Sequence, residues 1–181
     1  MVASPDNYIH LTTWNLEGNE GEISIGKYCL LTPGVRIASA SKIEIGDGCM
    51  FANSAYVSDA DWHGIYDRAT PVGKTAPISL DENVWIGDRA VVGKGVTIGK
   101  NSIVAAGAVV VKNVPSNVVV GGNPARIIKE LDPSVDGNTR IKLFQDPSGL
   151  KDLYDQIDRY TLKDNSIFDY IRSILLRNKS H

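Results

Sequence analysis

The chain has 181 residues with a hydrophobic content of 43%, enough to build the core of one domain with a small appendage. Its 19 Lys and Arg residues nearly balance 21 Asp and Glu residues, and the net charge of -2 gives no electrostatic reason to expect a nucleic acid or an acidic membrane as partner. Two cysteines make no disulfide framework, and neither a secretory signal nor a bilayer-length apolar run is evident. We therefore expect a cytoplasmic protein with no integral membrane segment.

After a lead-in of residues 1–22, the first part of the chain repeats an aromatic or aliphatic residue at short, regular intervals. These residues are Ile25, Leu31 and Ile37 in one set, and Ile45, Phe51 and Val57 in the next. Internal periodicity of this kind indicates a repeat architecture. Cys29 and Cys49 occupy the same place in the two sets, so we expect two small buried thiols stacked on one corner.

A long excursion interrupts the repeats in the middle of the chain. Ile25 and Ile45 are 20 residues apart, whereas Ile45 and Ile86 are 41 apart, which leaves a surplus of 21 residues. We place this inserted loop at about residues 63–83. A long loop on a regular scaffold usually carries function.

From Ile86 onward an aliphatic residue recurs every six residues without a slip. The series is Ile86, Val92, Ile98, Val104 and Val110. The fourth position of each hexad holds Arg89, Gly95, Asn101, Gly107 and Asn113. Gly and Asn tolerate a left-handed backbone, so each hexad predicts a short strand with one inward side chain, followed by a turn. Three such faces close a triangular coil of stacked parallel strands, with Ile86 over Val104 and Val92 over Val110.

The repeats end near Pro115, and the remaining chain has a different pattern. We expect a short helix over about 125–131 that caps the open end of the coil, as in other stacked-repeat proteins. Apolar residues at helical spacing then predict two amphipathic helices, at roughly 148–160 and 165–178. The expected organisation is a coil over residues 23–124 and a helical extension over 125–181. We favour packing of the last helix on the coil or on another subunit over a membrane-surface role.

Three features of the sequence resemble those of a known family. The stretch from Asn83 to Gly87 (NVWIG), the hexads up to Pro115, and the stretch from Gly121 to Arg126 (GGNPAR) look like the hexapeptide-repeat acyltransferases. The maltose/galactoside and nodulation O-acetyltransferase branch is the most similar, over about residues 23–130. The resemblance implies an all-β fold, a left-handed parallel β-helix, assembled as a homotrimer with acetyl-CoA between adjacent subunits and no metal.

Catalysis of acyl transfer needs a base, a donor to the developing oxyanion, and a site that holds both substrates in line. Among three histidines, His10 precedes the repeats and His181 ends the sequence, whereas His63 stands at the mouth of the inserted loop. The resemblance places the catalytic histidine there, so we predict His63 as the general base rather than a solvated bystander. Asp59 and Asp61 are candidates to orient the imidazole, with ordinary turn chemistry as the alternative.

The remaining site predictions concern the two substrates. Asn53 and Trp62 are candidates to line the acceptor site, although Asn53 also suits a turn and Trp62 also suits simple packing. By resemblance, Trp85 and Ala106 match positions along the pantetheine arm of acetyl-CoA. Lys112, Arg126 and Lys129 match basic positions near its nucleotide and phosphates, with a solvated surface as the alternative for the two lysines.

The sequence therefore predicts an acetyl-CoA-dependent transferase that acetylates a hydroxyl of a carbohydrate or sugar-containing acceptor. One alternative is an amino-sugar or nucleotide-sugar N-acyltransferase of polysaccharide biosynthesis, and another is a noncatalytic trimeric scaffold. Acetylation of a drug-like acceptor also stays open. A γ-carbonic-anhydrase-type zinc site is disfavoured, because it needs three histidines and this chain has one near the coil.

Overall fold

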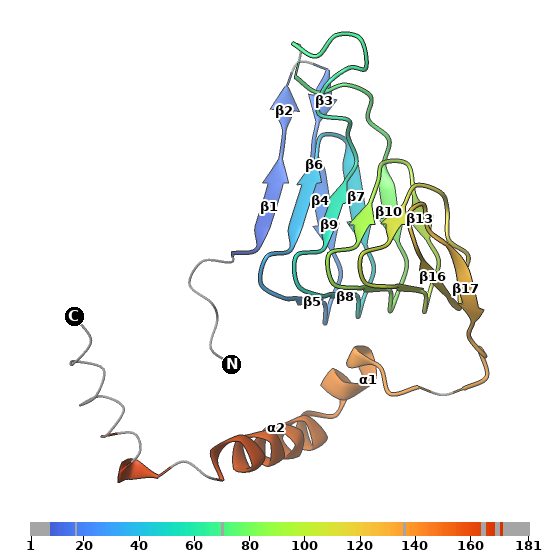
Figure 1. Cartoon of the computed structure of the whole chain (residues 1–181). Coiled ribbons are helices and arrows are strands. Elements are labelled where there is room, and N and C mark those ends of the chain that lie inside the picture. The colour runs from blue at the N-terminus through green and yellow to red at the C-terminus, as the bar shows by residue number, and fades with distance from the viewer. Residues whose placement is uncertain are drawn as a thin grey trace. The chain divides into compact units, whose positions relative to one another are not determined.

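The computed structural model describes residues 8–16, 18–69, 71–135, 137–163, 166–168 and 171. The chain divides into two compact units, residues 1–141 and 142–181. The first unit is a three-sided parallel β-helix (Figure 1). Its short strands pass from one sheet to the next in a fixed cycle, so each full coil adds one strand to each sheet.

Sheet 1, as we call it, has the strand order β1-β6-β9-β12-β15, all parallel. Its members are β1 (His10–Thr13), β6 (Arg36–Ser39), β9 (Tyr56–Ser58), β12 (Val91–Val92) and β15 (Val109–Val110). Because β1 pairs in register with β6, the paired strands begin at His10. The expected lead-in of residues 1–22 thus already contributes a strand to the coil.

Sheet 2 has the order β13-β10-β7-β4. It contains β4 (Glu22–Ile25), β7 (Lys42–Ile45), β10 (Ile78–Leu80) and β13 (Thr97–Ile98). Sheet 3 has the order β17-β16-β14-β11-β8-β5. It contains β5 (Leu30–Leu31), β8 (Met50–Phe51), β11 (Trp85–Ile86), β14 (Ile103–Val104), β16 (Val118–Gly121) and β17 (Arg126–Glu130). A small antiparallel hairpin of β2 (Asn15–Leu16) and β3 (Asn19–Glu20) lies outside these sheets.

The core is the inside of this coil, as the hexads predict. All five inward residues of the hexad series, Ile86, Val92, Ile98, Val104 and Val110, are fully or almost fully buried. The register places Ile86 beside Val104 and Val92 beside Val110, which confirms the expected stacking. Stacked aliphatic side chains remove apolar surface from water along the whole coil.

The turns follow the expected backbone pattern in four of five hexads. Arg89, Gly95, Asn101 and Gly107 all have positive φ. The fifth predicted position, Asn113, does not have it, and the next left-handed residue is Asn117, at the following corner. Asn113 instead lies level with Thr97, and its Oδ1 accepts a hydrogen bond from the Thr97 backbone N–H at 2.9 Å.

The inserted segment lies earlier than the sequence suggested. β10 pairs with β7 from Ile78 onward, so the chain rejoins the coil at that residue. Ile45 consequently stacks on Leu80, whereas Ile86 stacks on Phe51. The excursion covers residues 59–77, which we call the arm, rather than 63–83. The error arose because the sequence equated Ile45 with Ile86, although these two residues belong to different sheets.

The predicted cap helix at 125–131 is wrong, because this segment is the strand β17, paired antiparallel with β16. Its β-branched residues Ile127 and Ile128 favour an extended backbone, and β16 offers unpaired hydrogen-bonding groups at its edge. Further on, α1 (Arg140–Gln145) precedes α2 (Pro147–Leu162), which matches the helix expected at 148–160. The helix expected at 165–178 lies almost entirely outside the described residues.

The two cysteines stack as expected, since Leu30 pairs with Met50 in the strands that directly follow them. Both thiols are free, with Cys49 buried and Cys29 only partly buried. The hydrogen bond between them lowers the pKa of Cys29 to about 7 and raises that of Cys49, which burial raises further. In the described part of the chain, no helix is long and apolar enough to cross a bilayer.

Candidate functional site

The arm leaves the coil at the corner between sheets 1 and 2 and returns there as a narrow antiparallel loop. Isolated bridges join Ala60 to Thr75 and His63 to Pro71. Between these bridges, the backbone N–H of Val72 donates to the Trp62 carbonyl at 3.0 Å. Gly73 lies so close that a Cβ there would be 2.6 Å from the His63 carbonyl oxygen. The backbone of His63 is therefore held by the opposite side of the arm, while its side chain is exposed.

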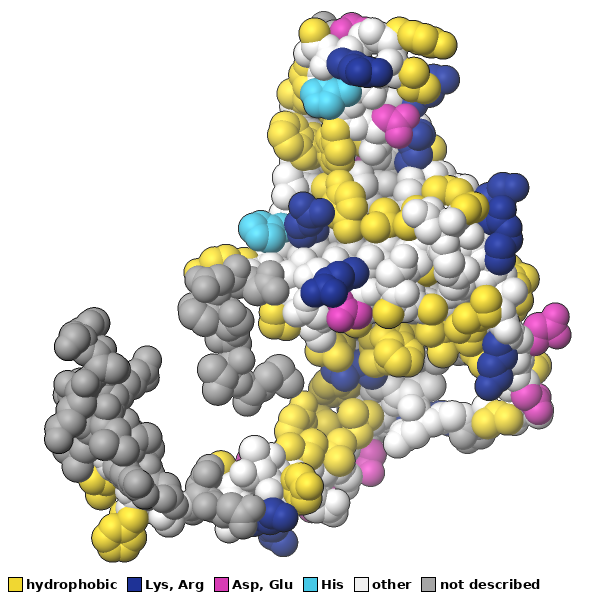
Figure 2. Space-filling model, viewed as in Figure 1, with side chains coloured by type: hydrophobic (Ala, Val, Ile, Leu, Met, Phe, Trp, Pro, Cys, Tyr) yellow, Lys and Arg dark blue, Asp and Glu magenta, His cyan; other side chains and the backbone are white. Residues whose placement is uncertain are grey.

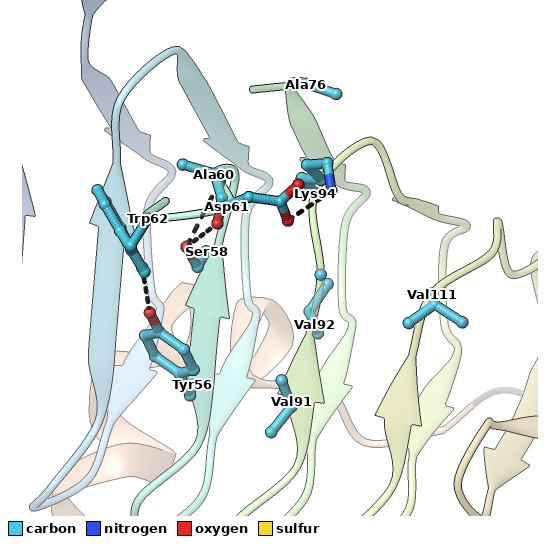
Figure 3. Close-up of a pocket in the computed structure, with 11 residues that line it drawn as sticks. Tyr56, Ser58, Ala60, Asp61, Trp62, Ala76, Val91, Val92, Lys94 and Val111 are labelled. Carbon is cyan, nitrogen blue, oxygen red and sulfur yellow. Dashed lines mark hydrogen bonds and ion pairs between the residues drawn. The ribbon is translucent and has the colours of Figure 1, made fainter. Parts of the chain in front are cut away.

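A hollow of about 420 Å³ lies at the base of the arm, against the outer face of sheet 1. It is lined by Tyr56, Ser58, Ala60, Asp61, Trp62, Ala76, Val91, Val92, Gly93, Lys94 and Val111. Figure 3 shows the polar contacts in it: Trp62 reaches Tyr56, Asp61 reaches Lys94, and the Ser58 hydroxyl contacts the Ala60 backbone. The Trp62 Nε1–H donates to the Tyr56 hydroxyl at 2.9 Å, and the Lys94 ammonium lies 2.6 Å from Asp61 Oδ1. His63 does not line this hollow but follows Trp62 directly.

Of the two carboxylates predicted to orient the imidazole, Asp59 is fully buried and has a different set of partners. It accepts hydrogen bonds from the Ser39 hydroxyl at 2.6 Å and from the backbone N–H groups of Ala40 and Ser41 at 2.8 and 3.0 Å. These donors belong to the preceding coil, so Asp59 braces the corner from which the arm departs.

Asp61 is ion-paired with Lys94. Within the described residues, neither carboxylate forms the predicted contact with His63.

The structure separates the two predicted acceptor residues. Trp62 lines the hollow, whereas Asn53 lies at a turn on a different corner and does not. The Asn53 side chain accepts a hydrogen bond from the Ser54 hydroxyl at 2.7 Å, and its carbonyl accepts one from the Arg89 N–H at 2.9 Å. The turn role is therefore the one that the contacts of Asn53 support.

Two of the predicted donor-binding residues meet in a second hollow, of about 260 Å³, near the end of the coil. Lys112 and Arg126 both line it, beside apolar residues of β15, β16 and β17. The ion pairs among the described residues join Lys42 to Glu44, Lys94 to Asp61 and Lys100 to Glu82. The positive charges of Lys112 and Arg126 thus face the hollow without an acidic partner in that part of the chain.

The other three predicted donor residues line neither hollow. Trp85 is 43% exposed on β11, and Lys129 is exposed on β17. Ala106 is exposed at the turn after β14, where the backbones are close: a Cβ on Gly87 would lie 2.6 Å from the Ala106 nitrogen. Small residues at this place leave the outside of the turn open to an extended ligand.

Sequence reasoning missed Tyr56 and Lys94, which hold the base of the arm. Both occupy outward positions that look like ordinary surface: Tyr56 precedes the inward Val57, and Lys94 precedes the turn glycine Gly95. The signal that would have found them is their sheet position, because β9 and β12 are neighbours beside the arm.

On the face in Figure 2, described Lys and Arg side chains are separate from one another and form no continuous basic stripe.

Comparison with known proteins identifies the fold family. Residues 77–112 match the family model "Bacterial transferase hexapeptide (six repeats)". Over 112 residues the chain is 35% identical to the galactoside O-acetyltransferase of Escherichia coli (strain K12), covering 61% of this chain and 55% of that enzyme. Over 71 residues it is 51% identical to the 2,3,4,5-tetrahydropyridine-2,6-dicarboxylate N-acetyltransferase of Clostridium perfringens (strain SM101 / Type A), covering 39% of this chain and 30% of that enzyme.

A solved structure gives the broadest of the three matches. It is a hexapeptide-repeat-containing acetyltransferase of Vibrio cholerae O1 biovar eltor in complex with acetyl-coenzyme A, with 31% identity and a TM-score of 0.57. The match covers 68% of this chain and 70% of that one. By contrast, the chain spans only about half the length of the galactoside enzyme, 55%. The parallel coil, its hexads and these matches show that the chain belongs to the hexapeptide-repeat acetyltransferase family.

Proposed function

We propose that this protein transfers the acetyl group of acetyl-CoA to a hydroxyl of a carbohydrate or sugar-containing acceptor, with His63 as general base. The observation that carries the proposal is the arm. It is the longest excursion from the coil in the described residues, and it presents an exposed His63 on a backbone that is held by Pro71 and Gly73. A histidine side chain near neutrality is suited to accept a proton from a hydroxyl.

The proposed reaction is a direct transfer. His63 removes the proton of the acceptor hydroxyl as its oxygen bonds to the thioester carbonyl carbon. The carbon–sulfur bond then breaks, and the proton passes from His63 to the departing thiolate. No covalent acyl-enzyme is needed, and neither cysteine is a suitable nucleophile, because both thiols lie on the corner between sheets 2 and 3, away from the arm.

Lys112 and Arg126 are the residues that we assign to the charged end of the donor. Two cations on one hollow suit phosphate groups, to which arginine binds in a bidentate manner. Trp85 and Ala106 would then border the pantetheine arm, and Lys129 would lie near the nucleotide. The bound acetyl-coenzyme A of the Vibrio cholerae relative supports this donor.

The hollow beside the arm is our candidate for the acceptor. An aromatic ring beside polar groups suits a sugar, which has both apolar faces and hydroxyls, and Trp62, Asp61 and Lys94 supply these features. Similarity to the galactoside O-acetyltransferase favours a hydroxyl acceptor. Similarity to an N-acetyltransferase keeps an amino-sugar acceptor as the second candidate.

We further propose that the protein is a homotrimer with a left-handed coil and that the donor lies between subunits. Exposed apolar side chains on the outside of the coil, such as Val111 at 55% and Ile127 at 51%, support burial against neighbouring copies. Closed symmetry is the rule for soluble homo-oligomers. Light scattering at several protein concentrations tests the mass of the assembly.

The experiment that tests the function measures thiol release from acetyl-CoA in the presence of sugars, amino sugars and nucleotide sugars. We expect release that depends on the acceptor, together with a product that hydroxylamine cleaves, because an ester reacts and an amide does not. A hydroxylamine-resistant product would establish the N-acetyl alternative. A protein that neither binds CoA in calorimetry nor releases thiol would be a scaffold, and the proposal would be wrong.

A further inference from the structure

We propose that Lys94 and Tyr56 are positioning residues: each holds one of the two residues before His63, and together they fix the imidazole relative to the acceptor hollow. This inference rests on the proposed function, since it concerns how the base is held. It assigns roles to two side chains that lie outside the arm. Tyr56 belongs to β9, and Lys94 belongs to the turn after β12, the strand next to β9.

The first contact comes from the coil that follows the arm. Lys94 lies in the turn between β12 and β13, and its Nζ is 2.6 Å from Oδ1 of Asp61, which is 33 residues away in the sequence. The same turn also contacts the end of the arm through its backbone, because the N–H of Gly95 donates to the Ala76 carbonyl at 3.0 Å. This turn is thus in contact with both sides of the arm at its base.

The second contact comes from the preceding coils. Tyr56 on β9 accepts the hydrogen bond of Trp62 at 2.9 Å, and the Arg36 guanidinium lies 4.5 Å from the centre of the Tyr56 ring. The Trp14 ring, next to the β2–β3 hairpin, lies 5.6 Å from the ring of Trp62. Figure 1 shows this hairpin and the arm at the same end of the sheets. Trp62 is therefore held from the coils before the arm, and Asp61 from the coil after it.

The backbone of the arm next to His63 is strained and closely packed. Val72, which donates its N–H to Trp62, has φ of 58°, a conformation that a β-branched residue rarely adopts. Such a strained residue persists only where its surroundings hold it in place. Gly73 beside it leaves no room for a Cβ against the His63 carbonyl. The side-chain contacts of Asp61 and Trp62 stabilise this part of the arm backbone.

The expected effect is on turnover rather than on folding. Partly exposed ion pairs contribute little to the stability of a fold. A displacement of a reacting group by about 1 Å, however, can lower the rate by about 10²-fold. Loss of either contact should therefore leave the coil folded and the donor site intact, while the imidazole loses its fixed position.

The test uses single-group variants of the full chain, assayed by thiol release. We expect Lys94→Met, Asp61→Asn and Tyr56→Phe each to lower kcat by about 10-fold or more, with KM for acetyl-CoA and the melting temperature nearly unchanged. Lys94→Arg keeps the cation and should recover most of kcat. The matched control is Lys100→Met, which removes the partner of Glu82 in a surface ion pair of 2.9 Å and should leave kcat unchanged.

A double variant separates positioning from a general loss of charge. Because Lys94 and Asp61 act through one contact, Lys94→Met combined with Asp61→Asn should cost no more than the larger single effect. Wild-type kcat in Lys94→Met and Tyr56→Phe would overturn the inference, as would an effect confined to KM. Failure of the proposed function looks different: the wild type would release no thiol, or His63→Ala would be fully active.

Discussion

Two corners of the same coil differ in regularity. The corner from sheet 2 to sheet 3 carries an asparagine ladder, in which Asn83 donates to Asn101 and Asn101 donates to Asn117, both at 3.0 Å. All three asparagines have positive φ. The corner from sheet 1 to sheet 2 instead carries the β2–β3 hairpin and the arm. The regular corner repeats one stabilising contact, whereas the irregular one has different residues and contacts in each coil.

The difference teaches how such a coil combines stability with chemistry. Stacked residues cannot project far from the surface, since each turn is covered by the next. Under the proposed function, the group that reaches a substrate has to leave the register, and His63 lies on a segment that does so. Changes at buried or stacked residues, including Asp59 at the base of the arm, should therefore lower stability. Changes at the exposed part of the arm should lower turnover. The predictions below test that division in order of decreasing effect.

The largest effect is expected in the core that both corners enclose. Phe51 is fully buried and stacks between Leu31 and Ile86. Phe51→Ala leaves a cavity and should reduce the free energy of unfolding by about 3–5 kcal/mol. Denaturant titration at a fixed protein concentration measures this loss of free energy, with Tyr66→Phe on the exposed arm as control. A loss below about 1 kcal/mol would show that the coil is not held by this stack.

At the irregular corner, Asp59→Ala removes the brace beneath the arm. Three donors from Ser39, Ala40 and Ser41 lose their acceptor, so we expect a loss of about 3 kcal/mol in the free energy of unfolding. Asp59→Asn keeps one acceptor oxygen and should lie between alanine and the wild type. Equal stability of all three proteins would contradict a bracing role.

The regular corner should respond more weakly to Asn101→Ala. This change removes two amide hydrogen bonds and forces alanine into φ of 62°, at a cost of about 2 kcal/mol. Asn101→Gly removes the same bonds without the backbone strain, so it should be less damaging. If glycine and alanine unfold at the same denaturant concentration, the positive φ does not contribute to the loss.

The smallest effect concerns the stacked thiols on this same corner. With its pKa lowered to about 7, Cys29 is mostly thiolate at pH 8 and mostly thiol at pH 6, and the thiolate is the reactive form. Alkylation of Cys29 by iodoacetamide should therefore reach half its maximal rate near pH 7. Cys49→Ala removes the main cause of the shift and should move this midpoint toward higher pH. An unchanged midpoint would mean that Cys49 does not cause the lowered pKa of Cys29.

Repetition explains which features the sequence could predict. Ile86 to Val110 identified the coil because each hexad repeats one local structure, and Arg89 and Gly95 marked left-handed turns for the same reason. The helix expected at 125–131 failed because the edge of β16 determines the backbone of β17, and an unpaired edge leaves no mark in the sequence of its partner.

The contacts around the candidate site were harder to predict, because they connect distant residues. The sequence placed His63 and Trp62 beside the loop, and the structure has both on the arm, while Lys112 and Arg126, predicted from their motifs, line one hollow. The bond between Asp61 and Lys94 joins residues 33 positions apart and depends on the exact length of the arm. Asp59 was misassigned for a related reason: its partners at Ser39, Ala40 and Ser41 lie on the preceding coil.

The most direct test of the account compares turnover and stability in His63→Ala. Thiol release, CoA affinity and the melting temperature are measured on the same preparations of variant and wild type. Loss of the base should lower turnover by about 10²–10⁴-fold, with CoA affinity and melting temperature unchanged. An alanine variant that turns over at the wild-type rate would contradict the claim that the arm carries the catalytic base.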